Sequence, residues 1–408
     1  MLSPTPAPSR APSYVAVLRT PQAARAFGAV LLGRLSYGTA PLALMLAVKD
    51  TTGSYSAAGA VMALFGATSV FLSPARAALI DRYGPRRALP PMAAAYAALL
   101  TALTYATWGP GASSSLLGAL AVAAGACTPP LGPVMRTLWS ELLPDRELLR
   151  RAYSLDGVAE ELMFVTGPLL VGVLIRYTVP AAGVAVGAGL VLVGVLALVS
   201  SPALRAIGTP ARSSSSGKTT GWRLLGVAGL RHAALVAAAV GLCLGALDLL
   251  VVAFTEQHGR GGAVAWVLAA LSAGSAVGGL AYGAVRWRGS NRSRLPVPAV
   301  GLGAAMVLAG LSPGVYALVA VVAVAGVFVA PALTTAYLVA DESVDPAVRT
   351  QAGAWVNTAV NAGTSVGTAV VGLLVDRLSP AVCFALAAVP ALLCAAVVAR
   401  GAVERSRR

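Results

Sequence analysis

The chain has 408 residues, of which 57% are hydrophobic and 11% are charged, and it carries a formal net charge of +15. Soluble domains carry roughly 25% charged residues, so the composition excludes a soluble globular protein and indicates a polytopic membrane protein. The positive charge does not indicate nucleic-acid binding, because the basic residues lie in alternate loops and not on one soluble face.

Twelve apolar stretches approach the length of about 20 residues that a membrane-crossing helix needs. In the first half of the chain the predicted spans are residues 25–49, 54–80, 88–108, 114–140, 152–175 and 181–200. In the second half they are residues 228–255, 262–285, 296–312, 314–340, 351–375 and 379–400. We therefore expect an all-α protein with an N-terminal tail (1–24), a six-helix bundle (25–200), a linker (201–227), a second bundle (228–400) and a C-terminal tail (401–408).

The basic residues also predict an orientation. Most of the 30 Lys and Arg residues lie in the tails, the linker and the loops on one side of the predicted spans. By the positive-inside rule this side is the cytoplasm, so both termini are expected in the cytoplasm of a multi-pass protein of the cell membrane.

The two halves resemble each other at an offset of 200 residues. Asp145 then aligns with Asp345, Gly167 with Gly367, and Gly172 with Gly372. Parallel repeats joined by a linker are a transporter architecture.

The loop between the second and third spans holds a short cluster with one acid, three arginines and a Gly-Pro pair, Asp81-Arg82-Tyr83-Gly84-Pro85-Arg86-Arg87. This cluster, with six plus six helices and a central linker, closely resembles the major facilitator superfamily over nearly the whole chain. The resemblance implies two pseudo-symmetric bundles that rock around a midplane cavity. The family's loop motif begins with a glycine where this chain has Ala77, and Arg76 adds a further charge.

The resemblance also implies a cytoplasmic gate made of Asp81, Arg82, Gly84, Arg86, Arg87 and Arg136. Asp81 is expected to contact Arg136 and the N-terminus of the eleventh helix near Thr350, where exposed N–H groups favour an anion. The alternative is that the basic cluster is only a topology signal.

Ionisable residues inside predicted spans usually face a cavity or a partner, because a charge in a bilayer is unfavourable. Arg34 in the first span and Glu160 and Glu161 in the fifth lie at nearly the same depth at a rise of 1.5 Å per residue. We expect Arg34 to pair with Glu161 or Glu160, and the other glutamate to approach Asp156. The alternative is a static ion pair that only holds helices together.

Three further features bear on transport. Glu161 and Asp248 are the candidates for proton coupling. Asp248 has no basic residue at its depth in the sequence and is expected to bind a proton or a substrate cation in the central cavity, the alternative being a cytoplasmic-side or crevice position with local hydrogen bonds. Asn357 and Asn361 are candidate cavity residues, or bridges between helices. The segment with Gly167, Pro168 and Gly172 partly resembles the antiporter motif of drug-exporting bacterial members, and it predicts either a hinge or a plain kink.

No catalytic triad, metal-ligand spacing or nucleotide-binding loop is found, so we expect neither an enzyme nor a cofactor or metal. The expected function is proton-coupled efflux of a small hydrophobic or weakly cationic solute by a monomer, with protons and membrane lipids as its other partners and no nucleic acid. A proton-coupled importer of a nutrient and a non-transporting receptor or scaffold are the alternatives.

Overall fold

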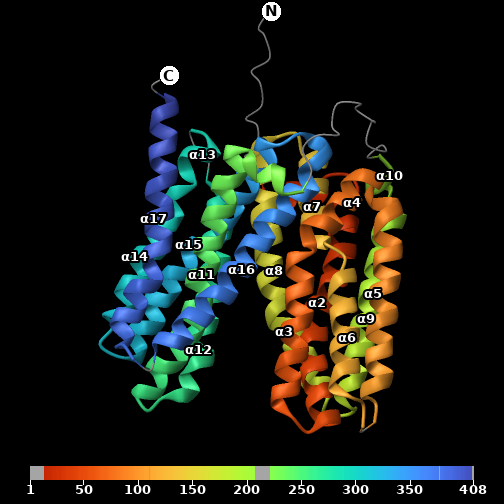
Figure 1. The fold of residues 1–408 in the computed structure, drawn as a ribbon. Coiled ribbons are helices and arrows are strands. Elements are labelled where there is room, and N and C mark those ends of the chain that lie inside the picture. The colour runs from red at the N-terminus through yellow and green to blue at the C-terminus, as the bar shows by residue number, and fades with distance from the viewer. Residues whose placement is uncertain are drawn as a thin grey trace, which may run out of the picture.

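The computed structural model describes residues 13–109, 111–206, 221–285, 287, 289–375 and 377–406, and these contain helices and no strand. The helices form two groups that lie side by side (Figure 1). The first group holds α1 (Tyr14–Arg19), α2 (Ala23–Thr52), α3 (Tyr55–Phe71), α4 (Ser73–Tyr83), α5 (Pro85–Thr107), α6 (Ser114–Cys127), α7 (Leu131–Leu142), α8 (Arg146–Leu174), α9 (Pro180–Ser200) and α10 (Pro202–Ala206).

The second group begins with the 3-10 helix η2 (Gly221–Gly226). It continues with α11 (Ala228–Gln257), η3 (Gly261–Ala263), α12 (Val264–Ala284), α13 (Asn291–Arg294), α14 (Pro296–Gly310), α15 (Val315–Ser343), η4 (Pro346–Val348), α16 (Arg349–Leu374) and α17 (Pro380–Ser406).

These helices confirm the predicted all-α fold of two six-helix bundles. Within the described residues, ten helical stretches are long and apolar enough to cross a membrane, and α3 with α4 forms an eleventh span bent by 41°. The twelfth span is α16, which is 26 residues long and carries several polar side chains.

Two of the predicted spans are broken into two helices each. The second span breaks at Leu72, just before Pro74, and the fourth breaks between Cys127 and Leu131, where Pro129 and Pro130 stand. A proline lacks the N–H that a continuing helix needs and restricts the residue before it, so it favours these breaks. Both breaks leave backbone carbonyls without helical partners in the middle of the first group.

The repeat offset has a structural basis in helix capping. The Asp145 carboxylate accepts hydrogen bonds from the backbone N–H groups of Glu147 and Leu148 at 2.7 and 3.0 Å, and so caps α8. Asp345 caps η4, just before α16, in the same way, through the N–H of Ala347 at 2.9 Å. An aspartate at the N-cap satisfies donors that the helix cannot.

The two groups meet at the end of the molecule that carries α10, α13 and the last turns of α17, which we call the linker end, and they diverge towards the opposite end (Figure 1). At the linker end, Thr137 of α7 lies 3.1 Å from the hydroxyl of Thr350 in α16. Arg349 of α16 approaches the hydroxyl of Ser140 in α7 at 3.4 Å.

The structure adds detail to the expected tails and linker. Within the expected N-terminal tail, α1 is helical and residues 1–12 lie outside the described part. The expected linker contains α10 and η2, with residues 207–220 outside the described part. The expected C-terminal tail is helical as far as Ser406, because α17 continues beyond residue 400.

Candidate functional site

A cavity of about 320 Å³ opens where the two breaks of the first group face α2, α8 and α16. Its lining is largely apolar and includes Met62, Phe65 and Met163. The charged residues of the lining are Arg34, Arg76 and Glu160, and the amides are those of Asn357 and Asn361. The two asparagines predicted as cavity residues therefore do line it, and both come from α16.

Beside this cavity, Arg34 of α2 pairs with Asp156 of α8. The two distances are 2.9 Å from Nη1 to Oδ1 and 3.3 Å from Nη2 to Oδ2, so the contact is bidentate. Both residues are buried, with 4% of the Arg34 side chain and none of the Asp156 side chain exposed. A charged pair removed from water to this degree requires several good hydrogen bonds to be tolerated.

Arg136 of α7 joins this pair to a second acid. Its Nε lies 3.1 Å from Oδ2 of Asp156, and its Nη2 lies 2.6 Å from Oε2 of Glu160. Two arginines and two carboxylates thus form one network with no net formal charge. Arg34 and Glu160 both line the cavity, and Glu160 is the more accessible of the two, with 35% of its side chain exposed against 4% for Arg34.

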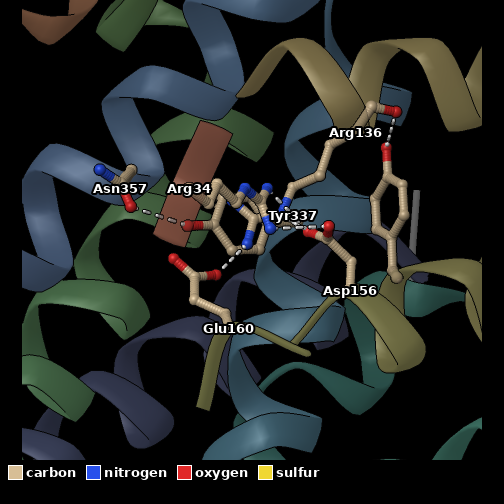
Figure 2. Close-up of polar contacts among 7 residues, drawn as sticks. Arg34, Arg136, Asp156, Glu160, Tyr337 and Asn357 are labelled. Atoms are coloured by element: carbon tan, nitrogen blue, oxygen red, sulfur yellow. Dashed lines mark hydrogen bonds and ion pairs between the residues drawn. The ribbon is translucent and has the colours of Figure 1, made fainter. Parts of the chain in front are cut away.

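The network belongs to the first group of helices but touches the second through one aromatic ring. The guanidinium carbon of Arg136 lies 3.7 Å from the ring centroid of Tyr337 in α15, a cation–π contact (Figure 2). The Tyr337 hydroxyl lies 3.5 Å from Oδ1 of Asn357 in α16, so the ring connects Arg136 to the cavity lining. Arg136 therefore contacts Glu160 and the second group of helices at the same time.

The expected pairing of Arg34 with Glu161 or Glu160 is wrong, since its partner is Asp156. The expected contact between Arg136 and Asp81 is also wrong, because Arg136 binds Asp156 and Glu160 instead. The physical reason for the first error is that α8 begins at Arg146, six residues before the predicted start, so Asp156 takes the depth assigned to the glutamates.

Glu161 faces away from the network, as expected for a neighbour turned by about 100° on a helix. Its Oε1 accepts a hydrogen bond of 3.1 Å from the hydroxyl of Ser275 in α12, across the two groups of helices. Asp248 of α11 is exposed, has no hydrogen-bond or ion-pair partner among the described residues, and is not among the residues that line the 320 Å³ cavity. The structure therefore does not bring Asp248 to Glu160 or Arg34.

The charged loop cluster lies at the linker end. The turn between α4 and α5 is the single residue Gly84, whose φ of 80° suits a glycine because other side chains rarely adopt it. Asp81 accepts a hydrogen bond of 2.8 Å from the backbone N–H of Gln351 near the N-terminus of α16. The residues Arg82, Arg86 and Arg87 are exposed.

The helix with the glycine-proline segment is not broken, since α8 runs through Pro168. A Cβ at Gly167 would lie 2.4–2.6 Å from backbone atoms of Gly38 in α2, so this glycine allows the two helices to touch. A Cβ at Gly172 would meet nothing within 4 Å. Gly167 is therefore required for close packing of α8 against α2, whereas Gly172 is not.

Sequence reasoning missed two residues of the site, Tyr337 and Arg76. Tyr337 is one tyrosine in an apolar helix and carries no local signal. Arg76 carries a signal, because it is a charge within a predicted span, yet the family resemblance associates it only with the loop cluster. In the structure it is 6% exposed and donates to carbonyls at both helix breaks.

A sequence model of the Major Facilitator Superfamily matches residues 26–297 and 234–407. No curated protein sequence matches the chain. Among solved structures, a bacterial homologue of the iron transporter ferroportin in its outward-facing state is similar with a TM-score of 0.71 at 16% identity, over 94% of this chain and 99% of that one.

Two other solved structures are similar. The human organic anion transporter MFSD10 (TETRAN) has a TM-score of 0.66 at 17% identity, over 95% of this chain and 100% of that one. The E. coli fucose:proton symporter FucP has a TM-score of 0.65 at 15% identity, over 93% and 99%. Identities this low show a shared fold and nothing finer.

Proposed function

Because the chain belongs to the major facilitator superfamily, we propose that it is a proton-coupled secondary transporter that exports a small hydrophobic or weakly cationic solute across the cell membrane. The observation that carries the proposal is Glu160, which lines the cavity and at the same time pairs with Arg136 at 2.6 Å. Its carboxylate is a site where a proton and a cationic solute would compete, as an exchanger requires.

The neutral network supports this exchange by its charge balance. When a proton or a solute cation neutralises Glu160, Arg136 keeps only Asp156, which already binds Arg34. Arg136 is then held more weakly, and its contact with Tyr337 of the second bundle is free to change. Occupation of the cavity would thereby alter the contact between the bundles, which is what alternating access needs.

The cavity lining supports the substrate class. Phe65, Tyr37 and Met62 offer apolar and aromatic surface, and Asn357 and Asn361 offer a few hydrogen-bonding groups. A sugar would need many more polar groups at the wall. Arg34 and Arg76 are almost fully buried, so Glu160 is the best exposed charge that a solute meets.

We also propose that the linker end is cytoplasmic, on the asymmetry of basic residues. The contacts between the bundles there, among them Asp81 with the N–H of Gln351, then close the cytoplasmic side. Asp81 acts in this proposal as the lock, Gly84 as its turn, and Arg82, Arg86 and Arg87 as the basic rim at the lipid headgroups. Gly167 with Pro168 is in this proposal the flexing element of α8 between the two bundles.

The test uses everted membrane vesicles with an imposed pH gradient and ethidium, a lipophilic cation, as the probe. Wild-type vesicles should accumulate ethidium when their interior is acidic, and Glu160→Gln should reduce gradient-driven accumulation at least about tenfold, as expected for loss of a coupling group. Glu161→Gln is the matched control, because its carboxylate binds Ser275 and not Arg136. Ethidium uptake that does not depend on the pH gradient would overturn the proposed proton coupling. Ethidium movement only out of the acidic vesicles, together with protons, would indicate a symporter.

A further inference from the structure

Arg76 lies where the two broken spans of the first bundle expose their carbonyl groups. Its Nη1 donates to the carbonyl oxygens of Gly125 and Ala126 at 2.8 and 3.1 Å, at the end of α6. Its Nη2 donates to the carbonyl oxygen of Ser69 near the end of α3, and Thr68 lies 3.5 Å from Nη1. One guanidinium thus bonds to the C-terminal ends of two helices.

The two helix ends are brought together by the absence of a side chain. A Cβ at Gly125 would lie 2.4 Å from the carbonyl oxygen of Phe65 and 3.1 Å from the backbone nitrogen of Ser69, so α6 and α3 touch there. The C-terminal end of a helix carries a partial negative charge of roughly half an electron. Two such ends facing one point form a site for a single positive charge.

This carbonyl site has the chemistry of an alkali-metal site. In transporters with broken helices, unwound carbonyls and the C-terminal ends of half-helices coordinate Na⁺. Here the same kind of ligand set surrounds a guanidinium that is 6% exposed. Among the described residues Arg76 forms no ion pair with a carboxylate, whereas Arg34 and Arg136 both do. The titratable side chains around Arg76 are Tyr37, Cys127 and Tyr96, none of them a carboxylic acid.

We propose that Arg76 is a tethered cation that permanently fills a carbonyl site between the two broken spans. Because the Arg76 guanidinium occupies this site, which borders the cavity, neither Na⁺ nor K⁺ binds there in the wild-type protein. When the side chain is removed, the site becomes a binding site for a free monovalent cation, with guanidinium as the best match in shape and Na⁺ as a smaller substitute. This inference concerns the two breaks and does not depend on the proposed proton-coupled export.

The first experiment is chemical rescue of Arg76→Ala, followed by thermal unfolding of the full-length protein in detergent. In choline chloride the variant should unfold several degrees below wild type, because a buried cation is lost and carbonyls are left unpaired. Replacing part of the choline with guanidinium at constant ionic strength should restore most of this Tm loss, and Na⁺ should restore part of it. Arg223→Ala, which removes an exposed arginine, should respond to no cation.

Three results would overturn the proposal. The first is a Tm for Arg76→Ala that is the same in choline, Na⁺ and guanidinium. The second is a gain in Tm that Arg223→Ala shows equally, since this would be a general solvent effect. The third is stimulation of the wild-type protein by Na⁺ or K⁺, in stability or in ethidium uptake at a fixed pH gradient, and this measurement decides even if the alanine variant does not fold. Arg76→Lys, which keeps a tethered cation, should lose less stability than Arg76→Ala and gain nothing from Na⁺.

Discussion

Asp156 and Glu160 lie one helical turn apart and bind the same arginine, yet their surroundings differ. Asp156 is fully buried and holds both Arg34 and Arg136, whereas Glu160 is 35% exposed and holds Arg136 alone. Removing one partner of a buried pair is strongly destabilising because the other charge stays buried without compensation. The two acids should therefore differ in what they contribute to stability.

We predict that Asp156→Asn lowers the free energy of unfolding by about 3 kcal/mol, because it leaves two buried arginines with one acid. Glu160→Gln should lower it by about 1 kcal/mol, since its site is partly exposed and Asp156 still compensates Arg136. The measurement is thermal unfolding of both purified variants beside wild type. If both variants lose the same free energy of unfolding, then the different burial of Asp156 and Glu160 does not determine how much each acid contributes to stability.

The residues of this network could be recognised from the sequence, but their partners could not. Arg34, Glu160 and Glu161 stood out because charges within apolar spans are rare. Which acid faces Arg34 depends on where α2 and α8 begin, and Arg34 lies eleven residues after Ala23 while Asp156 lies ten after Arg146. An error of a few residues in a helix start moves the depth by a whole turn, so hydropathy alone could not give the pairing.

At the scale of the element, α2 and α8 touch at Gly38 and Gly167. We predict that Gly167→Ala reduces stability by about 1–3 kcal/mol, the usual loss on overpacking, because its Cβ would meet the Gly38 backbone at 2.4–2.6 Å. Gly172→Ala, on the same helix with open space around it, should be neutral or stabilising. Thermal unfolding of the pair separates the two glycines, and a Gly172→Ala variant as unstable as Gly167→Ala would contradict the packing argument.

The positions of most helices follow from apolar length, because nothing else satisfies the backbone inside a bilayer. The two breaks do not follow from apolar length, because the mean hydropathy of a span does not change where a proline or a turn interrupts the helical hydrogen bonds. The only local sign of the interruption in the fourth span is the pair Pro129 and Pro130, which stand between α6 and α7. The bend at Leu72 had only Pro74 as its sign.

For the whole molecule, the contact between Asp81 and α16 is one of those that hold the bundles together at the linker end. We predict that Asp81→Asn weakens this contact by about 1 kcal/mol, the usual gain of an anion at a helix N-terminus, and so favours opening of this end about fivefold. Hydrogen exchange followed by mass spectrometry should show faster exchange at the start of α16 and in α4, with lower ethidium transport.

The matched control for this prediction is Asp345→Asn. Asp345 also accepts a backbone N–H, that of Ala347, but both partners belong to the same bundle. Its replacement should affect exchange around η4 and leave transport near the wild-type rate. If Asp345→Asn opens the linker end as much as Asp81→Asn does, the contact between bundles is not what Asp81 contributes.

The polar character of α16 has a consequence for how the protein is made. Its 26 residues are enough to cross a membrane, but they include the two cavity asparagines and several threonines. Among the described helices that make up the twelve spans, counting the bent pair as one, α16 alone falls short of the mean hydropathy expected for a membrane span. Two of its glycines, Gly363 and Gly367, pack against the backbone of α11 at Ala238 and Leu242, more than a hundred residues earlier in the chain. Because α11 is synthesised first, it is already in the bilayer when α16 leaves the ribosome. We therefore expect stable insertion of α16, the eleventh span, to depend on its packing against α11 and not on its hydropathy alone.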